Sequence, residues 1–155
     1  DAGRGLLLKG DVAGNFAAMP ASASGIRLTG DQRGCAVADF DRDGRPDLLV
    51  GQNSGQTKLY RNRSAKRGLR VRLAGQAANP TGVGAKLRLG SATALGPARE
   101  LWSGGGFRSQ DSTVTVLSLG DQSPTRLQVA WPSGGVSKTV IEKGAVEITV
   151  EEPVP

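Results

Sequence analysis

The residues best suited to chemistry lie close together in an acidic stretch at residues 39–47. Its carboxylates stand at positions 1, 3, 5 and 9 of the stretch, as Asp39, Asp41, Asp43 and Asp47. Calcium takes roughly six to eight oxygen ligands, and alternate residues of a curled loop point their side chains to a common centre. Carboxylates this close also repel one another unless a cation lies between them. The sequence therefore predicts one calcium ion bound in this loop.

Two neighbouring residues complete the predicted site. Gly44 has no Cβ and allows the sharp turn that closes the loop. Arg45 is expected to offer its backbone carbonyl, with its side chain pointing away. Magnesium fits less well because it prefers a strict octahedral shell with several waters, and zinc because it prefers nitrogen and sulfur ligands. The loop is no complete EF-hand, since Val50 stands where a glutamate would close one.

Two alternatives to a functional calcium site remain open. The stretch could be an aspartate-rich turn that binds no ion. A bound ion could also do no more than hold the fold together, without touching a substrate.

The elements around this loop are predicted to be β-strands. With 23 glycines, 8 prolines and few aromatic residues, the composition favours short strands and tight turns. Short apolar runs precede residues 62–67, and strict alternation of apolar and polar residues follows, as in strands with one buried face. We expect an all-β chain of antiparallel sheets. Residues 1–64 would form a unit like one propeller blade, residues 68–151 a β-sandwich or barrel, and residues 152–155 a frayed tail.

The expected strands fall into two groups. Those of the first part are expected at residues 6–8, 26–28, 34–38, 48–50 and 57–61, with a loop at residues 17–24. Those of the second part are expected at residues 69–73, 83–89, 113–116, 127–131 and 146–150. Cys35 lies in one of these runs and is predicted to be a buried structural thiol.

The chain carries a net charge of +6. Six basic residues lie close together: Arg61, Arg63, Lys66, Arg67, Arg70 and Arg72. They indicate either a solvated face or a patch for an anionic partner. Nucleic acid is disfavoured because no aromatic residue for base stacking follows Tyr60 within the cluster. No apolar run is long enough to span a membrane.

The residues needed for common catalytic machinery are missing from the sequence. There is no histidine, so the chain cannot build a Ser-His-Asp or Cys-His site. No serine precedes a lysine by three positions, and outside the loop the acidic residues are scattered. We expect a protein that is not an enzyme. Its recognition surface would be the exposed face of the second sheet and the turns at residues 104–110 and 131–135. Phe107, Arg108 and Gln110 could meet a partner there, although for Phe107 a place in the core is the preferred expectation.

Two resemblances to known families cover nearly the whole chain. Residues 34–62 resemble an FG-GAP/VCBS-type repeat through Val-Ala-Asp-Phe-Asp-Arg-Asp-Gly-Arg-Pro-Asp-Leu-Leu-Val at residues 37–50 and Leu-Tyr-Arg-Asn at residues 59–62. Residues 68–151 resemble the ASPIC/UnbV domain. They do so through the motifs at residues 69–73, 82–85, 104–107, 109–110, 119–120 and 131–134.

The first resemblance implies an integrin-type propeller blade whose calcium ligands are Asp39, Asp41, Asp43, the Arg45 carbonyl and Asp47. One blade cannot close a propeller, so the remaining blades would lie outside this chain. The two families together imply a secreted, extracellular or periplasmic module for adhesion or recognition, with carbohydrate or another protein as partner. An accessory domain of a larger secreted enzyme and a purely structural domain are the alternatives.

Overall fold

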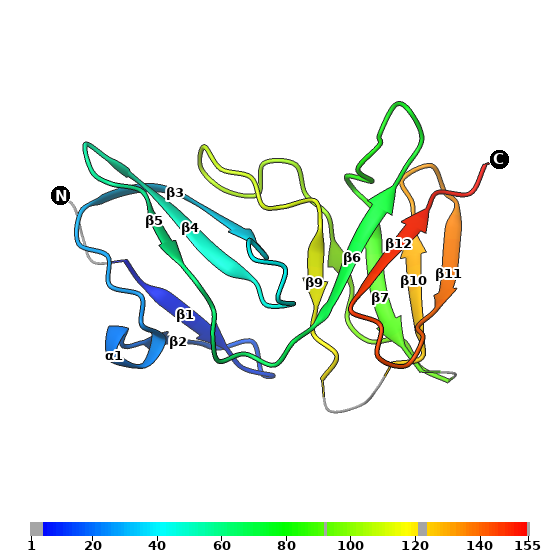
Figure 1. Ribbon diagram of the computed structural model, residues 1–155, viewed down its shortest axis with the longest axis horizontal. Helices are drawn as coiled ribbons and strands as arrows, with labels where there is room; N and C mark the ends of the chain where they lie inside the picture. The colour runs from blue at the N-terminus through cyan, green and yellow to red at the C-terminus, as the bar shows by residue number, and fades with distance from the viewer. Residues whose placement is uncertain (1–4, 92, 121–123, 155) are drawn as a thin grey trace.

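The computed structural model describes residues 5–91, 93–120 and 124–154, and these residues are almost entirely β-strand, turn and loop. Figure 1 shows the first strands of the chain on the left and the later ones on the right. The expected all-β class with mostly antiparallel sheets is confirmed.

The N-terminal part begins with a two-stranded antiparallel hairpin, β1 (Leu7–Gly10) and β2 (Phe16–Met19). In its turn, Asp11 Oδ1 accepts hydrogen bonds from the backbone N–H groups of Ala13 and Asn15, at 2.9 and 2.8 Å. A single helical turn, α1 (Ala21–Ser24), follows. The loop expected at residues 17–24 is therefore wrong, because its small residues form most of a strand and this short helix.

A three-stranded antiparallel sheet holds the acidic loop. Its strands are β3 (Asp31–Ala38), β4 (Asp47–Asn53) and β5 (Lys58–Tyr60), in that order. Ala38 pairs with Asp47, so the acidic loop is the connection between β3 and β4. The strand expected at residues 26–28 does not form, and Leu28 is buried in a segment without regular secondary structure.

The C-terminal part consists of two sheets. One has the order β11-β10-β7-β8, and its strands are β7 (Lys86–Gly90), β8 (Arg99–Glu100), β10 (Arg126–Ala130) and β11 (Val136–Val140). The other has the order β12-β6-β9, and its strands are β6 (Leu69–Ala74), β9 (Thr115–Leu117) and β12 (Glu147–Glu151). β6 and β12 pair in parallel, whereas the other strand pairs are antiparallel.

The main hydrophobic core lies between these two sheets. Its largest fully buried side chains come from both of them: Leu69, Val71, Leu87, Leu127 and Val129. Each belongs to a run that alternates with polar residues, so one face of β6, β7 and β10 packs in this core. Of the two predicted forms, the sandwich is therefore found, and no sheet within the described ranges closes on itself.

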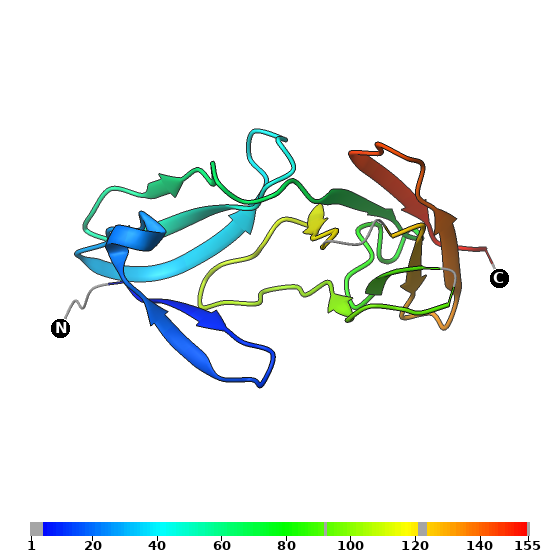
Figure 2. The same ribbon diagram turned by 90° about the horizontal axis from the view of Figure 1, so that it is seen from below.

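The N-terminal part has a much thinner core. Leu28 and Val50 are its buried hydrophobic residues among those described, whereas Leu8 and Phe16 of the hairpin are 50% and 72% exposed. Figure 2 shows the hairpin splayed away from the β3–β4–β5 sheet. No residue of β3 is buried, so Cys35 is exposed and the prediction of a buried thiol is wrong.

The end of the chain is better ordered than expected. Glu152, in the tail predicted to fray, is 8% exposed. Its Oε2 accepts a hydrogen bond from Gln76 N at 2.9 Å, and its Oε1 accepts one from Ser133 Oγ at 2.6 Å. The frayed tail is therefore wrong for Glu152, and Pro155 lies outside the described residues.

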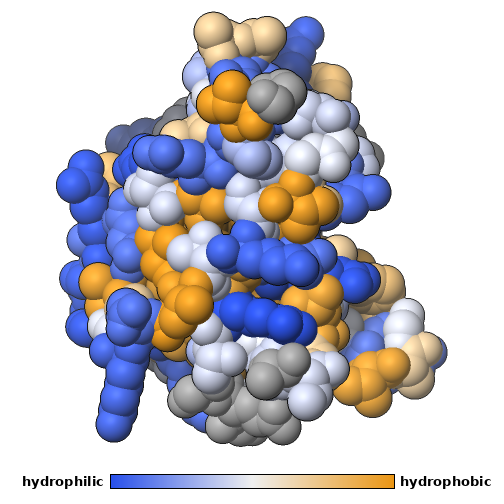
Figure 3. Space-filling view, turned by 90° about the vertical axis from the view of Figure 1, so that its right-hand side faces the viewer, coloured by the Kyte–Doolittle hydropathy of each residue, from blue (hydrophilic) through white to orange (hydrophobic). Residues whose placement is uncertain are grey.

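The face nearest the C-terminus carries exposed valines on and beside its strands, including Val136, Val140 and Val146. Figure 3 shows the hydrophobic areas of this face separated by hydrophilic side chains. In the described part of the chain, no helix has the length and apolar character needed to cross a membrane.

Candidate metal centre

The acidic loop is shaped by a glycine and by its own aspartates. Gly44 has a φ of 82°, a conformation that side chains disfavour. A Cβ on Gly44 would also come within 3.2 Å of the Gly68 carbonyl oxygen. Asp39 Oδ1 accepts a hydrogen bond from Asp43 N at 3.0 Å, and Asp39 Oδ2 accepts one from Gly44 N at 2.9 Å. These bonds fold the loop back over the end of β3.

Three of the predicted ligands come together in this loop. Asp39, Asp41 and Asp43 each bring one carboxylate oxygen within 4.8 Å of the others. Asp39 is 9% exposed, Asp43 is half-buried and Asp41 is exposed. Three converging carboxylate oxygens are hard donors of the kind that calcium prefers. The residues present therefore fit a calcium ion by donor type and by spacing.

Asp47 has a different environment from these three. It is 3% exposed, and both of its oxygens accept hydrogen bonds. Asp47 Oδ2 takes one from Phe40 N at 3.0 Å, and Asp47 Oδ1 takes one from Asn62 N at 2.8 Å. The side chain thus joins the loop to the segment that follows β5. Asp47 lies outside the cluster of three oxygens, and its role as a ligand stays a prediction, as does that of the Arg45 carbonyl.

Three arginines face the clustered carboxylates. Arg45 Nη1 lies 2.8 Å from Asp43 Oδ2, Arg61 forms an ion pair with Asp41, and Arg70 forms one with Asp39. The side chain of Arg45 therefore points toward the acidic cluster, and the expectation that it points away is wrong. These guanidinium groups offset the repulsion among the carboxylates, so repulsion alone does not require a metal ion.

Asp43 shows the balance of these effects. Burial by itself would raise the pKa of its carboxyl group, since it disfavours the charged form. The hydrogen bond and charge of Arg45, with help from the charge of Arg61, outweigh burial and lower the pKa below its usual value. Asp43 is consequently a carboxylate at neutral pH, as a metal ligand must be.

Arg70 connects the loop to the sandwich. It lies on β6 and is 6% exposed. Besides its ion pair with Asp39, its Nε donates a hydrogen bond to Glu147 Oε2 on β12 at 2.8 Å. Burial would lower the pKa of Arg70, but the bonds to Glu147 and Asp39 outweigh it and raise the pKa. A buried arginine between two carboxylates is a fixed link between the two parts of the chain.

Sequence reasoning missed Arg61 and Arg70 as partners of the loop. The signal that could have found them is the run of basic residues that follows the acidic stretch, since opposite charges close in sequence often pair. Within that run, Arg70 is buried and Arg61 is exposed. The alternative of a wholly solvated basic face is therefore wrong for Arg70.

The other predicted recognition residues lie in the loop that joins β8 to β9. Phe107 is 64% exposed, so the expectation that it is core is wrong. The Arg108 guanidinium stands over its ring at 5.4 Å from the centroid, and Gln110 is exposed. Trp131, the first residue of the other predicted turn, is 4% exposed, and its Nε1 donates to Ser137 Oγ at 2.9 Å.

Comparison with known proteins gives one family. Residues 75–154, just over half of the chain, match the model of the family described as ASPIC and UnbV. No curated protein matches the chain. The matched range contains most of the sandwich and leaves the acidic loop outside it. The resemblance of residues 34–62 to an FG-GAP/VCBS repeat therefore stays a prediction.

Proposed function

Because this chain belongs to the ASPIC and UnbV family, we propose that it is a non-catalytic β module that calcium stabilises and that recognises a partner. The observation that carries the calcium part is the cluster of Asp39, Asp41 and Asp43. A calcium ion that stabilises a fold is held by oxygen ligands in a fixed loop, and its coordination shell leaves no open position for a substrate. The hydrogen bonds within the loop and its link to β6 support this role.

The arginines set the conditions under which an ion would bind. Arg61 has a side chain that is 53% exposed, so it can turn toward solvent and leave Asp41 and Asp43 to the ion. Arg70, buried and held by Glu147, would stay in place beside Asp39. A site that keeps one arginine nearby binds calcium less tightly than one surrounded by carboxylates alone. We expect a dissociation constant on the order of 10⁻⁴–10⁻³ M, as in extracellular modules.

Calorimetry with calcium tests this site. The wild-type protein should bind one ion, and calcium should raise its melting temperature by mass action. Asp41→Asn keeps the size of the side chain but removes a charged ligand, so it should abolish most of both effects. Asp31→Asn is the matched control, because Asp31 is a carboxylate on β3 that pairs with Arg33 away from the loop. Equal calcium responses in all three proteins would refute the site.

The non-catalytic part of the proposal rests on the residues of the chain. It contains no histidine, and the loop carboxylates are engaged by arginines and backbone N–H groups. A screen with esters, phosphate esters and glycosides, with and without calcium, should show no turnover. Turnover that survives repurification and disappears on a point mutation in this chain would contradict it.

A role as accessory domain of a larger secreted enzyme is the second candidate, and the family match favours it. We propose that either form is secreted, to the periplasm or the extracellular space, where millimolar calcium would fill a weak site. Cell fractionation of the full-length protein, followed by activity measurements on it, would distinguish the two roles. The partner of a recognition module would be another protein or a carbohydrate.

A further inference from the structure

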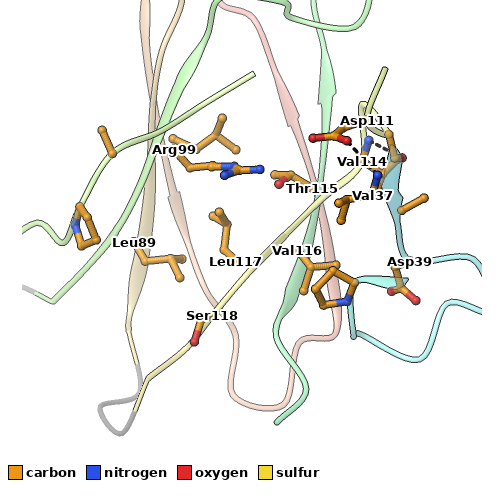
Figure 4. A pocket seen from close by; sticks show the side chains of 16 residues that line it. Val37, Asp39, Leu89, Arg99, Asp111, Val114, Thr115, Val116, Leu117 and Ser118 are labelled. Atoms are coloured by element: carbon orange, nitrogen blue, oxygen red, sulfur yellow. Dashed lines mark hydrogen bonds between the residues drawn. The ribbon is translucent and has the colours of Figure 1, made fainter. Parts of the chain in front are cut away.

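A pocket of about 430 Å³ lies where the two sheets of the sandwich present their edges to the N-terminal part. β8 is the last strand of one sheet, and β9 is the last strand of the other. Both strands line the pocket, and Val37 to Asp39, at the end of β3, close it on the third side. Figure 4 shows the Arg99 side chain extending into the pocket toward Thr115, with Leu89 and Leu117 below it.

The edge of β9 is open to a further strand. β9 pairs with β6 on one side, and no other strand of the described chain pairs with it. Just before β9, Ser112 N donates to Val37 O at 2.9 Å, so the segment that leads into β9 already bonds to the backbone of β3. An unpaired strand edge offers a row of N–H and C=O groups to an extended peptide. The geometry thus favours a ligand in strand conformation.

The walls of the pocket are largely aliphatic. Leu89, Val114 and Val116 are half-buried beside the fully buried Leu87. Aliphatic walls without an aromatic ring suit valine, leucine or isoleucine side chains better than a sugar ring. In an extended peptide every second side chain points to the same face. One apolar side chain can therefore enter the pocket while its neighbours point away.

Arg99 supplies a positive charge that the protein leaves unused. Its guanidinium has no hydrogen-bond or ion-pair partner in the described ranges, whereas the two carboxylates of the pocket are engaged. Asp39 pairs with Arg70, and Asp111 Oδ1 accepts a hydrogen bond from Val37 N at 2.8 Å. A guanidinium binds a carboxylate through two parallel hydrogen bonds. The net charge of +6 also favours an acidic partner.

A second hollow of about 480 Å³ continues the pocket past Arg99 and Thr115. Its wall includes Trp102, which is 66% exposed, whereas the other tryptophan, Trp131, is 4% exposed. The two hollows share four residues and together form a channel that runs along β9 and continues past Thr115 toward Trp102 and Glu100, whose carboxylate lies 3.8 Å from Lys86 Nζ. A ligand that follows this channel would pass Trp102, so the fluorescence of this indole reports its arrival.

We propose that this channel binds an extended acidic peptide segment of a partner protein, which adds to the edge of β9. An aliphatic side chain of the segment occupies the pocket beside Leu89, and a glutamate or aspartate side chain pairs with Arg99. Asp111 repels a second acidic group at the Val37 end and so fixes the direction of the segment. This inference deepens the recognition role proposed above and rests on it.

Binding of defined peptides to the whole chain tests the proposal. The probes are octapeptides with an acetylated N-terminus and an amidated C-terminus, in which valine alternates with serine. Each peptide of the series carries one glutamate, at a different position in each peptide. Matched peptides carry glutamine instead. We expect at least one glutamate peptide to bind and to change the Trp102 fluorescence, and its glutamine partner to bind at least about tenfold more weakly. Equal binding of glutamate and glutamine peptides would overturn the proposal.

A pair of variants tests whether Arg99 is the charge that binds the peptide. Arg99→Gln should weaken binding of the glutamate peptide about tenfold, because the paired hydrogen bonds are lost. It should leave the melting temperature unchanged, since Arg99 has no partner to lose among the described residues. Arg88→Gln is the control, because Arg88 is an exposed arginine of β7 that does not line the pocket. Equal loss in both variants would mean that net charge, not Arg99, attracts the peptide.

Backbone methylation tests strand addition. Two versions of the best peptide carry N-methyl groups on alternate residues, in the two possible registers. One version should lose binding, because its methyl groups remove the donors that face β9, and the other should keep it. Binding by both versions would overturn strand addition. Binding of polygalacturonate through Arg99 without any peptide binding would assign the channel to an acidic glycan, and dimerisation of the chain through β9 would assign it to a second copy.

The proposed calcium site and this channel can fail separately. Calcium binding is measured by its heat and by the shift in melting temperature, and peptide binding by Trp102 fluorescence. Asp41→Asn should remove the first signal and leave peptide binding measurable. Peptide binding that fails while calcium binding persists overturns the channel alone.

Discussion

Arg61 is an arginine that a calcium ion would have to move. It contacts Asp41, and its Nη2 lies 3.6 Å from Asp43 Oδ2, so it occupies part of the space between the clustered carboxylates. Replacing Arg61 with glutamine should raise calcium affinity about fivefold, because the ion no longer displaces an ion pair or meets a second positive charge. Titration calorimetry at low ionic strength measures the change.

Arg63→Gln is the control for this variant. Arg63 is exposed and lies two residues further along, so its loss changes the net charge by the same amount without touching the loop. The affinity of this variant should stay within about twofold of the wild type. If the two variants gain affinity equally, Arg61 acts through net charge and not as an occupant of the site.

The hydrogen bond between Arg70 and Glu147 makes the stability of the folded protein depend on pH, and the sign of this dependence follows from the pKa shift of Glu147. The hydrogen bond from Arg70, helped by the charges of Arg70, Arg72 and Arg42, lowers the pKa of Glu147 below its ordinary value of 4.5 despite partial burial. A depressed pKa stabilises the folded state above the unfolded pKa, and this stability is lost as pH falls through the folded pKa. Glu147 should therefore contribute its full share to the free energy of unfolding at neutral pH, and progressively less below about pH 4.5.

Glu147→Gln isolates this contribution. At pH 7 the variant should unfold with a free energy lower by about 0.5–1 kcal/mol, a small effect because the carboxylate is partly exposed and screened. The difference from wild type should shrink as the pH falls from 5 to 3. Urea unfolding at several pH values measures it, and a difference that stays constant with pH would contradict the assigned ion pair.

At the scale of elements, the loop between β8 and β9 holds the N-terminal sheet. Phe107 and Arg108 of this loop lie against Gly34 of β3, where a Cβ would come within 2.6 Å of the Phe107 carbonyl oxygen. Gly34→Ala should therefore push the loop away and lower the free energy of unfolding by about 1–3 kcal/mol. Chemical unfolding measures the loss. Gly51→Ala is the control, because a Cβ on Gly51 would lie 3.8 Å from the nearest oxygen. Gly104→Ala is unsuitable as a control because Gly104 has a positive φ, which alanine disfavours.

The strands differ in how well the sequence predicts them. Alternating runs such as those of β6, β10 and β12 were predictable because each buries one face, and period-2 burial is a local signal. β8 has two residues, and no pattern can be read from so short a strand. β11 was missed because its valines, Val136 and Val140, are exposed and do not mark a core face. The parallel pairing of β6 with β12 depends on tertiary structure and has no local signal.

The candidate site shows the same division. The spacing of Asp39, Asp41 and Asp43 around Gly44 predicted the cluster, because those residues are close in sequence. The contacts of Arg70 were not predictable, since Arg70 lies 31 positions from Asp39 and 77 from Glu147. The prediction that Cys35 is buried was wrong. Its apolar neighbours suggested that another layer would cover β3, and the described part of the chain forms no such layer.

At the scale of the whole molecule, the buried hydrophobic residues are distributed unevenly. The main core cluster lies entirely between residues 69 and 150, while the N-terminal part buries Leu28 and Val50 among its described residues. Amide protons of β6 and β10 should therefore exchange last, near the rate set by global unfolding, and those of β1 and β2 first. Hydrogen exchange followed by mass spectrometry checks this order.

Calcium should change that order in one place. Saturation with the ion should slow exchange in the acidic loop and the adjoining ends of β3 and β4, and leave the hairpin of β1 and β2 unaffected. In Asp41→Asn this local protection should be absent. Uniform slowing across the chain would show that the ion acts on the molecule as a whole and not through the loop.

The parallel pairing of β6 with β12 has a mechanical consequence. β6 is the first strand of the sandwich and β12 the last, and they are joined over five paired positions from Glu147↔Arg70 to Glu151↔Ala74. Tension applied to the chain before β6 and after β12 pulls these strands lengthwise past each other. Their hydrogen bonds must then break together, whereas a hairpin pulled from its open end loses them one at a time. Under an optical trap the sandwich should therefore yield at higher force than the N-terminal hairpin, which makes it the part of this chain that can bear load.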